Sequence, residues 1–203
     1  FLGFSCSNLA KSSIRLAWQD AGTFSIKAKN GGADGSVALF SEELLRDENR
    51  GLNTTVNGLI PIANKYQESV ADIIQLAAAA AITFCFPGPS VPFFIGRKDA
   101  TSANPAGRLP DVYDSVTDIL QNMADKGFTP EETVALMGAH SAGRQRFLDP
   151  STSELPLDTT WDELDHQFYI DTLAPSPPPG TFRLLSDYNL ARDPRTSPSW
   201  ITF

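Results

Sequence analysis

The sequence has no apolar run long enough to cross a lipid bilayer. Its longest run, residues 76–86, falls well short of the roughly 20 residues that a membrane-spanning helix needs, and its many alanines favour a tightly packed helix. Basic residues are also scarce, since 16 Lys and Arg stand against 24 Asp and Glu, for a net charge of −8. We therefore expect neither a membrane nor a nucleic acid among the partners.

Cysteine is nearly absent. Cys6 and Cys85 are the two in the chain, and they are either unrelated buried thiols or one disulfide. A bridge would close a loop of about 80 residues, contribute roughly 4 kcal/mol to stability and require an oxidising compartment. The chain starts at Phe1 with neither an initiator methionine nor a signal-like segment, so we expect a processed or partial chain. Asn53 begins an Asn-Thr-Thr glycosylation sequon, which is compatible with secretion.

Histidine is equally scarce, with His140 and His166 alone in the chain. His166 lies in WDELDHQFY among acidic residues, which is typical of an ordinary, partly exposed side chain. His140 comes near the end of a helix-forming stretch, directly after Gly138 and Ala139. Small residues at these two positions would let a flat cofactor approach the backbone. His140 is therefore either a structural histidine or a ligand.

Helical periodicity is what the chain does have. Apolar residues make up 41% and charged residues 20%, as expected for a globular protein with a real core. We predict a mainly α fold with almost no sheet. The predicted helices cover residues 7–22, 41–46, 54–66, 69–84, 114–126, 129–142 and 161–173. A glycine-rich loop is expected at 29–36 and a short hairpin at 181–190.

Residues at the helix ends support several of these assignments. Thr129 and Glu132 have the spacing of a capping box, and Ser69 and Asp72 fit a second one. Pro61 must either kink the helix that contains it or mark a boundary within it.

Residues 13–24 read SIRLAWQDAGTF and carry three candidate functional residues on one predicted helix. Arg15, Trp18 and Gln19 stand at i, i+3 and i+4, so on a helix their side chains lie on one face.

Together with GAHSAGRQRF around His140 and the LSD that ends at Asp187, this stretch resembles the haem peroxidases of the plant, fungal and microbial superfamily. The segments FFIGRKDA and GRLPD are also similar to that family. The resemblance is closest to the secreted fungal class II peroxidases, of the lignin and manganese type, and to their ascomycete relatives. Trp18 is the exception to this closest match, because a tryptophan at this position resembles the intracellular members of the superfamily.

The resemblance implies a helical fold with haem b between a distal and a proximal helix. It implies a single domain over residues 1–203, with a distal lobe over about 1–128 and a proximal lobe over about 129–203. His140 would bind the haem iron, and Asp187 would accept a hydrogen bond from its ring, which makes the imidazole a stronger donor to iron. Cys6 and Cys85 match a family disulfide.

The resemblance also implies two calcium sites, built from the oxygen ligands that a hard cation prefers. The residues that match the distal site are Asp20, Gly32, Asp34 and Ser36. The residues that match the proximal site are Ser141, Asp158, Thr160, the carbonyl of Glu163, and Asp165.

Gln19 departs from the family, which has its distal catalytic histidine at this position. In the family that histidine moves the proton of bound peroxide, Arg15 matches the arginine that stabilises the developing charge, and Asn49 matches the asparagine that orients the histidine. A glutamine amide can form a hydrogen bond with peroxide but cannot accept a proton near neutral pH. Loss of a general base typically costs about 10² to 10⁴ in rate.

Three hypotheses follow. The first is a secreted, monomeric haem peroxidase that oxidises a small reductant with hydrogen peroxide, with peroxide cleavage impaired at Gln19. The second is a secreted pseudo-peroxidase that binds haem and calcium with little catalysis. The third is a calcium-stabilised helical scaffold that no longer binds haem. The first is the leading hypothesis.

Overall fold

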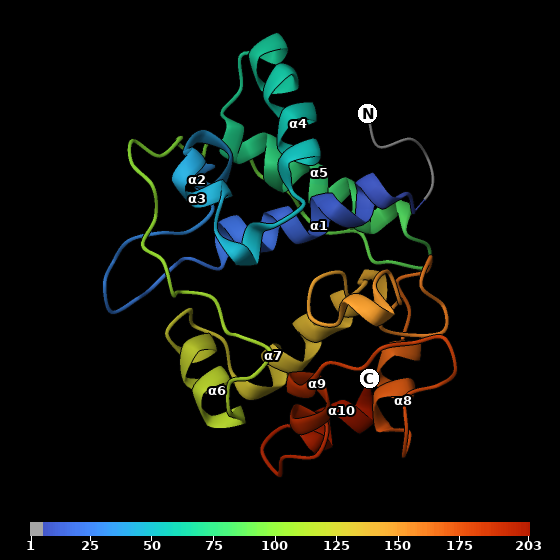
Figure 1. The fold of residues 1–203 in the computed structure, drawn as a ribbon. Helices are drawn as coiled ribbons and strands as arrows, with labels where there is room; N and C mark the ends of the chain where they lie inside the picture. Colours follow the sequence, from blue (N-terminus) through green and yellow to red (C-terminus); the bar gives the residue numbers. More distant parts are fainter. Residues whose placement is uncertain (1–5) are drawn as a thin grey trace. The chain divides into compact units, whose positions relative to one another are not determined.

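A computed structural model describes residues 6–203, which fold as helices joined by turns and irregular loops (Figure 1). The β-structure of these residues is limited to two isolated bridges, Ser25 with Asn30 and Arg144 with Pro156. The mainly α prediction is therefore confirmed. The chain forms two compact units, and we describe each by itself. Unit 1 comprises Phe1–Phe84 and Pro89–Leu109, and unit 2 comprises Cys85–Gly88 and Pro110–Phe203.

Each unit has its own set of helices. Those of unit 1 are α1 (Asn8–Ala21), α2 (Ser36–Leu39), α3 (Ser41–Leu44), the 3₁₀ helix η1 (Asp47–Asn49), α4 (Asn53–Tyr66) and α5 (Val70–Phe84). Those of unit 2 are α6 (Val116–Ala124), α7 (Pro130–Met137), η2 (Gly138–Ala142), η3 (Pro150–Thr152), α8 (Gln167–Leu173), α9 (Leu185–Leu190) and α10 (Ser197–Thr202).

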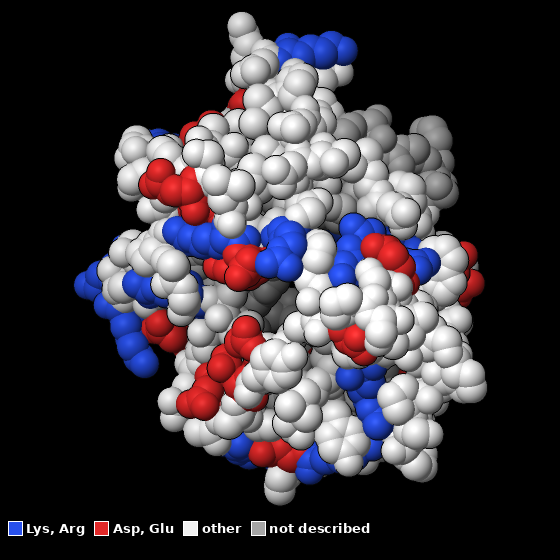
Figure 2. Space-filling model, viewed as in Figure 1, with Lys and Arg blue, Asp and Glu red and all other residues white. Residues whose placement is uncertain are grey.

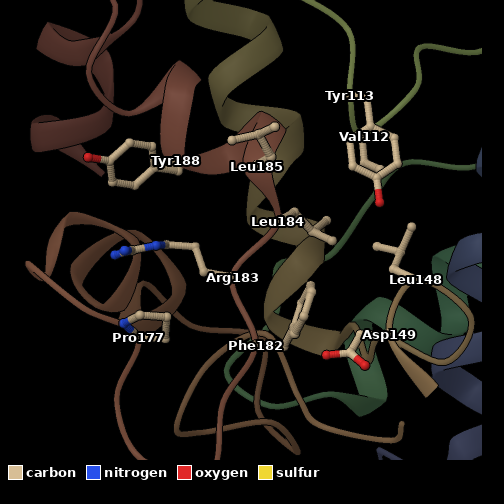
Figure 3. Close-up of a pocket in the computed structure, with 10 residues that line it drawn as sticks. All are labelled: Val112, Tyr113, Leu148, Asp149, Pro177, Phe182, Arg183, Leu184, Leu185 and Tyr188. Atoms are coloured by element: carbon tan, nitrogen blue, oxygen red, sulfur yellow. The ribbon is translucent and has the colours of Figure 1, made fainter. Parts of the chain in front are cut away.

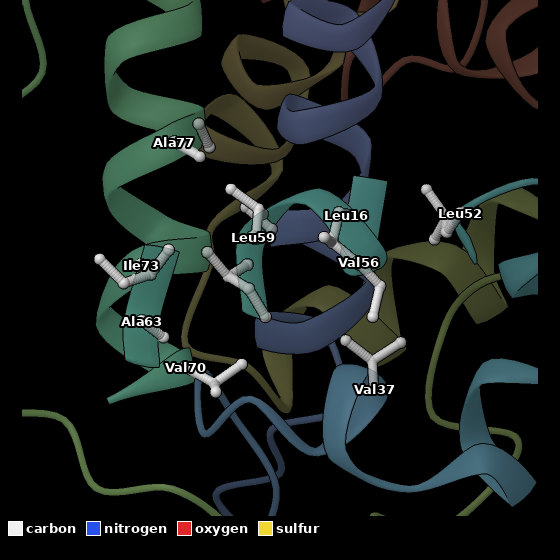
Figure 4. Close-up of a cluster of buried hydrophobic side chains, with 12 residues drawn as sticks. Leu16, Val37, Leu52, Val56, Leu59, Ala63, Val70, Ile73 and Ala77 are labelled. Carbon is white, nitrogen blue, oxygen red and sulfur yellow. The ribbon is translucent and has the colours of Figure 1, made fainter. Parts of the chain in front are cut away.

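The core of unit 1 lies where α1 packs on α5, with α4 and α2 closing over it (Figure 4). Leu16 of α1 is fully buried there, beside Leu59 and Val56 of α4. Ala77 and Ala78 of α5 are buried in the same cluster, and their small side chains allow the helices to pack closely. Burial of one leucine side chain contributes about 1.5–3 kcal/mol, so this interface fixes the orientation of α1.

The core of unit 2 is aromatic. Phe168 and Tyr169 of α8 pack against Trp200 of α10, with ring centroids 5.4–5.6 Å apart. The indole N–H of Trp200 donates to the carbonyl of Tyr169 at 3.3 Å. Because Trp200 is 1% exposed, its burial explains why the short helix α10 forms, although no pattern in the sequence predicted it.

Several predicted elements agree with the structure. Thr129 and Glu132 form the expected capping box at the start of α7. The helix predicted at 114–126 is present, capped by Ser115. Cys6 and Cys85 are disulfide-bonded, which confirms the bridge that the resemblance implied.

Other predictions need correction. The hairpin expected at 181–190 is wrong, because its second half forms α9, and of the helix expected at 161–173 only Gln167–Leu173 is helical. Pro61 marks no boundary, since α4 continues through it. Ser69 caps α5, but Asp72 does not complete a capping box. Its carboxylate instead accepts from the backbone of Gly96 at 2.6 Å and from the Arg97 guanidinium at 2.8 Å.

Charged side chains of both signs are interspersed on the face shown in Figure 2. Although the net charge is −8, the acidic side chains on that face do not form one continuous acidic patch. Of the helices between residues 6 and 203, none combines the length and the hydropathy that crossing a bilayer requires.

Candidate functional site

His140 and Asp187 form a hydrogen-bonded pair inside unit 2. His140 lies in η2, and its Nδ1 donates to Oδ2 of Asp187 in α9 at 3.0 Å. Burial alone would lower the pKa of His140, but the charge of Asp187 and the hydrogen bond to it outweigh burial and raise that pKa above its ordinary value. Asp187 is 1% exposed, so the pair brings together the two residues that the resemblance had selected.

The remaining nitrogen of this imidazole is open. Within residues 6–203, Nε2 of His140 makes no hydrogen bond, and Phe168 supports the ring edge-on with centroids 5.5 Å apart. A carboxylate on Nδ1 fixes the tautomer in which Nε2 carries the lone pair. The donor chemistry of His140 therefore fits a metal-bound cofactor such as haem.

Gly138 has a packing role that the sequence did not reveal. A Cβ at this position would lie 2.8 Å from the hydroxyl of Tyr169. That hydroxyl donates to the carbonyls of Val134 and Ala135, 2.8 and 3.2 Å away, near the end of α7. The glycine therefore makes room for Tyr169, and the approach of a flat cofactor to this backbone stays a prediction.

Two of the three predicted side chains on α1 share a backbone partner. Arg15 donates to the carbonyl of Glu48 at 2.6 Å, and Gln19 donates to the same oxygen at 2.9 Å. Arg15 also donates to the carbonyl of Arg50 at 2.9 Å. Trp18 lies on the same helix one turn before Gly22, and a Cβ added at Gly22 would lie 3.3 Å from the indole. The segment 48–50 therefore anchors the face that the i, i+3, i+4 spacing predicted.

The side-chain oxygen of Gln19 receives no hydrogen bond from the described residues. Because the carbonyl of Glu48 can only accept, the amide nitrogen of Gln19 must point to it, and Oε1 points elsewhere. Among the described residues Oε1 of Gln19 is buried without a hydrogen-bond partner, and so is Oδ1 of Asn49. Asn49 is 2% exposed and uses its amide nitrogen on the carbonyl of Glu43 at 2.8 Å. No hydrogen bond joins Gln19 to Asn49 within residues 6–203.

The distal calcium candidates cluster in unit 1 between α1 and the start of α2. Asp20 is 0% exposed, its Oδ2 accepts from the backbone of Gly35 at 3.0 Å, and its Oδ1 has no hydrogen-bond partner in the described chain. Burial raises the pKa of Asp20 to about 8, and the nearby charges of Asp34 and Glu43 add to this. A buried carboxylate oxygen without a donor fits a cation ligand.

The rest of the distal set is held by Thr23 and by a residue from a remote segment. Thr23 accepts from the backbone of Gly32 at 3.0 Å, and Asp34 accepts from the backbone of Ser36 at 3.1 Å. Asn104, which the sequence analysis missed, donates to the carboxylate of Asp34. No spacing signal could have selected it, because about 70 residues separate it from this loop.

The proximal calcium candidates also gather, within unit 2. The hydroxyl of Ser141 lies 2.5 Å from Asp158 Oδ2 and 3.1 Å from the carbonyl of Glu163, and Thr160 donates to Asp165 at 3.1 Å. Burial is the main cause that raises the pKa of Asp158 to about 6. These are carboxylate, hydroxyl and carbonyl oxygens, so the donor set fits calcium.

Neither cation set is a cluster of acidic side chains alone. In the part of the chain that the structure describes, no group of three or more His, Cys, Asp and Glu residues could hold a metal ion by itself. Calcium at either position would therefore also use hydroxyl and backbone carbonyl oxygens, as hard cations commonly do.

A cavity of about 430 Å³ opens in unit 2 (Figure 3). Tyr113 and Phe182 supply aromatic surface, while Asp149 and Arg183 supply the charged atoms of its lining. The guanidinium of Arg183 is engaged by the carbonyl of Ala174 at 2.6 Å. The cavity is large enough for a small aromatic molecule.

These contacts define a helical protein whose histidine, paired with a buried aspartate, can ligate a metal cofactor. The model of the peroxidase family, described as Peroxidase, matches residues 4–203, so the chain belongs to the peroxidase family. Together with the fungal relatives described next, this match confirms the resemblance to fungal peroxidases.

The curated relatives include fungal peroxidases. Versatile peroxidase VPS1 of Pleurotus eryngii is 36% identical over 98% of this chain and 60% of its own length. Manganese peroxidase 3 of Phlebia radiata and ligninase C of Trametes versicolor are each 35% identical over 100% of this chain, covering 62% and 61% of their lengths. The chain thus spans about 60% of the relatives that it matches.

Proposed function

We propose that this chain is the haem-binding part of a secreted peroxidase, which oxidises a small reductant with hydrogen peroxide and is impaired at Gln19. The hydrogen bond of 3.0 Å between His140 and the buried Asp187 carries the proposal. It is supported by membership of the peroxidase family. The disulfide of Cys6 and Cys85 supports an oxidising, extracellular location.

His140 would hold haem b through Nε2. When bound, haem supplies an iron centre that accepts two oxidising equivalents from peroxide and passes them to the reductant. Asp187 keeps the proton on Nδ1 and raises the basicity of the ring, which strengthens its bond to iron. A buried carboxylate is suited to this role, because low solvent access strengthens its interaction with the imidazole.

Arg15 would supply positive charge to the peroxide side, and its position is fixed by the carbonyls of Glu48 and Arg50. Gln19 would offer Oε1 to a peroxide O–H as a hydrogen-bond acceptor. It would not take the proton, because an amide is not a base near neutral pH. The proton would have to leave to water, which predicts a slow first step.

We further propose two calcium ions, one at Asp20, Gly32, Asp34 and Ser36 and one at Ser141, Asp158, Thr160, Glu163 and Asp165. Each set includes a residue adjacent to a proposed functional side chain, Asp20 beside Gln19 and Ser141 beside His140. Calcium would therefore stabilise the segments that carry both. The cavity around Tyr113 is our candidate for the binding of the small reductant.

A catalytically silent haem protein is the second candidate. The missing proton acceptor at Gln19 favours it, since the amide nitrogen of Gln19 donates to the carbonyl of Glu48 and its Oε1 is not a base near neutral pH. Reaction with peroxide separates the two candidates, because the silent protein would bind haem and yet leave a phenol unoxidised.

The test is absorbance of the haem-loaded full chain, followed by stopped-flow mixing with hydrogen peroxide and guaiacol. We expect a Soret band that the His140→Ala variant loses, and slow but measurable phenol oxidation. Absence of a Soret band in the unaltered chain would refute haem binding. A Soret band without any peroxide reaction, even at high peroxide, would favour the second candidate.

A further inference from the structure

Asn104 joins the proposed distal calcium loop to a segment remote in the sequence. It is 7% exposed and lies in the irregular stretch that follows α5. Its Nδ2 is 2.8 Å from Oγ of Ser36, 2.9 Å from Oγ1 of Thr23, and 3.1 and 3.2 Å from the two carboxylate oxygens of Asp34. Two of these three partners belong to the residues that we assign to calcium.

The orientation of this amide follows from its neighbours. The carboxylate of Asp34 can only accept, and the hydroxyl of Thr23 already donates to the carbonyl of Asp20 at 2.8 Å. The group of Asn104 that faces them must therefore be the NH₂. Asn104 cannot offer an oxygen to a cation through that group, so it acts on the ligands and not on the ion.

The backbone of Asn104 is fixed as firmly as its side chain. Its N–H donates to Oε2 of Glu43 at 2.7 Å, and its carbonyl accepts from the guanidinium of Arg46. Glu43 is 0% exposed, so this contact lies inside unit 1. Asn104 is thus held in place from α3 while its amide reaches the loop that carries Asp34 and Ser36.

We propose that Asn104 is a positioning residue for the distal calcium ion. Its NH₂ group donates to Asp34 and Ser36 and would hold both as ligands of the ion. The same proposed site includes Oδ1 of Asp20, which has no hydrogen-bond partner among the described residues. Hydrogen bonds to metal ligands from outside the coordination shell typically account for about 10- to 100-fold in metal affinity. The inference rests on the distal calcium site of the proposed function.

The test is calorimetric titration of calcium into the chelator-treated full chain. We expect two binding events in the unaltered chain, of which Asp34→Ala removes one. Asn104→Ala should weaken that same event by about 10- to 100-fold and should have no further effect when combined with Asp34→Ala. The matched control is Asn57→Ala, an exposed asparagine of α4 in the same unit, and it should change neither event.

Unfolding temperatures with and without calcium separate positioning from a general structural role. The Asn104→Ala variant should lose most of the stabilisation that calcium gives through the distal site, whereas a purely structural role would lower both temperatures equally. Asn104→Ser is the second variant if the alanine variant does not fold.

The outcomes are distinct. If Asn104→Ala leaves the event that depends on Asp34 unchanged, or strengthens it, the positioning role is wrong while the calcium proposal stands. If the unaltered chain shows no event that depends on Asp34, the distal calcium proposal and this inference both fail.

Discussion

The surroundings of His140 and those of Gln19 differ in how completely their polar atoms are matched. Nδ1 of His140 meets a buried carboxylate at 3.0 Å. Around Gln19, by contrast, Oε1 and the Oδ1 of Asn49 are buried without partners among the described residues. Buried acceptors without donors are costly, so this part of unit 1 has the form of a site whose hydrogen-bond donor is missing. The comparison places the unmatched polar atoms at Gln19 and Asn49 in unit 1, whereas the pair that we propose to hold haem is matched.

Replacement of Gln19 tests this contrast most strongly. The Gln19→His variant supplies a base, and its ring N–H would be a donor for Oδ1 of Asn49. We expect the reaction of the haem-loaded chain with peroxide to accelerate by about 10² to 10⁴, measured by stopped flow. Gln75→His, at another amide that donates to a backbone carbonyl in unit 1, should leave the rate unchanged. An unaltered rate in the Gln19→His variant would mean that α1 does not serve peroxide.

The two cation sets offer a second contrast, in pH dependence without calcium. The folded chain raises the pKa of Asp20 to about 8 and that of Asp158 to about 6, both from 3.8. In that range the folded state holds protons that the unfolded state releases, so stability falls as pH rises. We expect a loss on the order of a few kcal/mol, which ends near pH 6 for Asp158 and near pH 8 for Asp20.

Urea unfolding with a chelator, at several pH values, measures this loss. Asp20→Asn should abolish the decline between about pH 6 and pH 8, whereas Asp158→Asn should leave that part of the curve in place. Added calcium should flatten both curves, since it replaces the missing positive charge. Stability that is level across this range without calcium would contradict the burial of an ionisable Asp20.

Asp187→Asn tests the His140–Asp187 pair, which is the more fully hydrogen-bonded of the two regions compared. The amide cannot carry the negative charge that raises the basicity of His140, so we expect haem affinity to fall by about 10- to 100-fold. The rate of haem transfer to an excess of apomyoglobin is the measurement. His166→Gln, at the exposed histidine of unit 2, is the control and should transfer haem as slowly as the unaltered chain. Equal rates for all three proteins would separate Asp187 from haem binding.

The smallest effect concerns Gly138. A methyl group there would press on the hydroxyl of Tyr169, so Gly138→Ala should cost about 1–3 kcal/mol of unfolding free energy. Combined with Tyr169→Phe, which removes that oxygen, the alanine should cost much less. Chemical denaturation of the apo chain checks this. Additive losses would mean that Gly138 has another role.

The fold was predictable where local chemistry decides it. Thr129 with Glu132 and the stripe that buries Ile119 and Met123 specify α7 and α6 from short-range pattern alone. α9 was missed because its six residues are too few for a periodic signal. Asp72 was misassigned because a remote segment around Arg97 competes successfully for its carboxylate.

The residues of the sites divide in the same way. His140, Asp187, Arg15 and Gln19 could be selected from the sequence, because a family motif surrounds each of them. Tyr169 and Asn104 could not, because their hydrogen bonds span 35 and 70 residues, to Val134 and Asp34.

By itself the sequence determined that the chain is helical and acidic, and it has glutamine at the position where the family resemblance implies a proton acceptor. Those properties depend on residue type and short spacing. Only the tertiary structure decided which carboxylates are buried, which amide oxygens have no donor and which remote residue holds the loop of Asp34 and Ser36. Burial and hydrogen-bond partners depend on chain segments that meet only in the folded state.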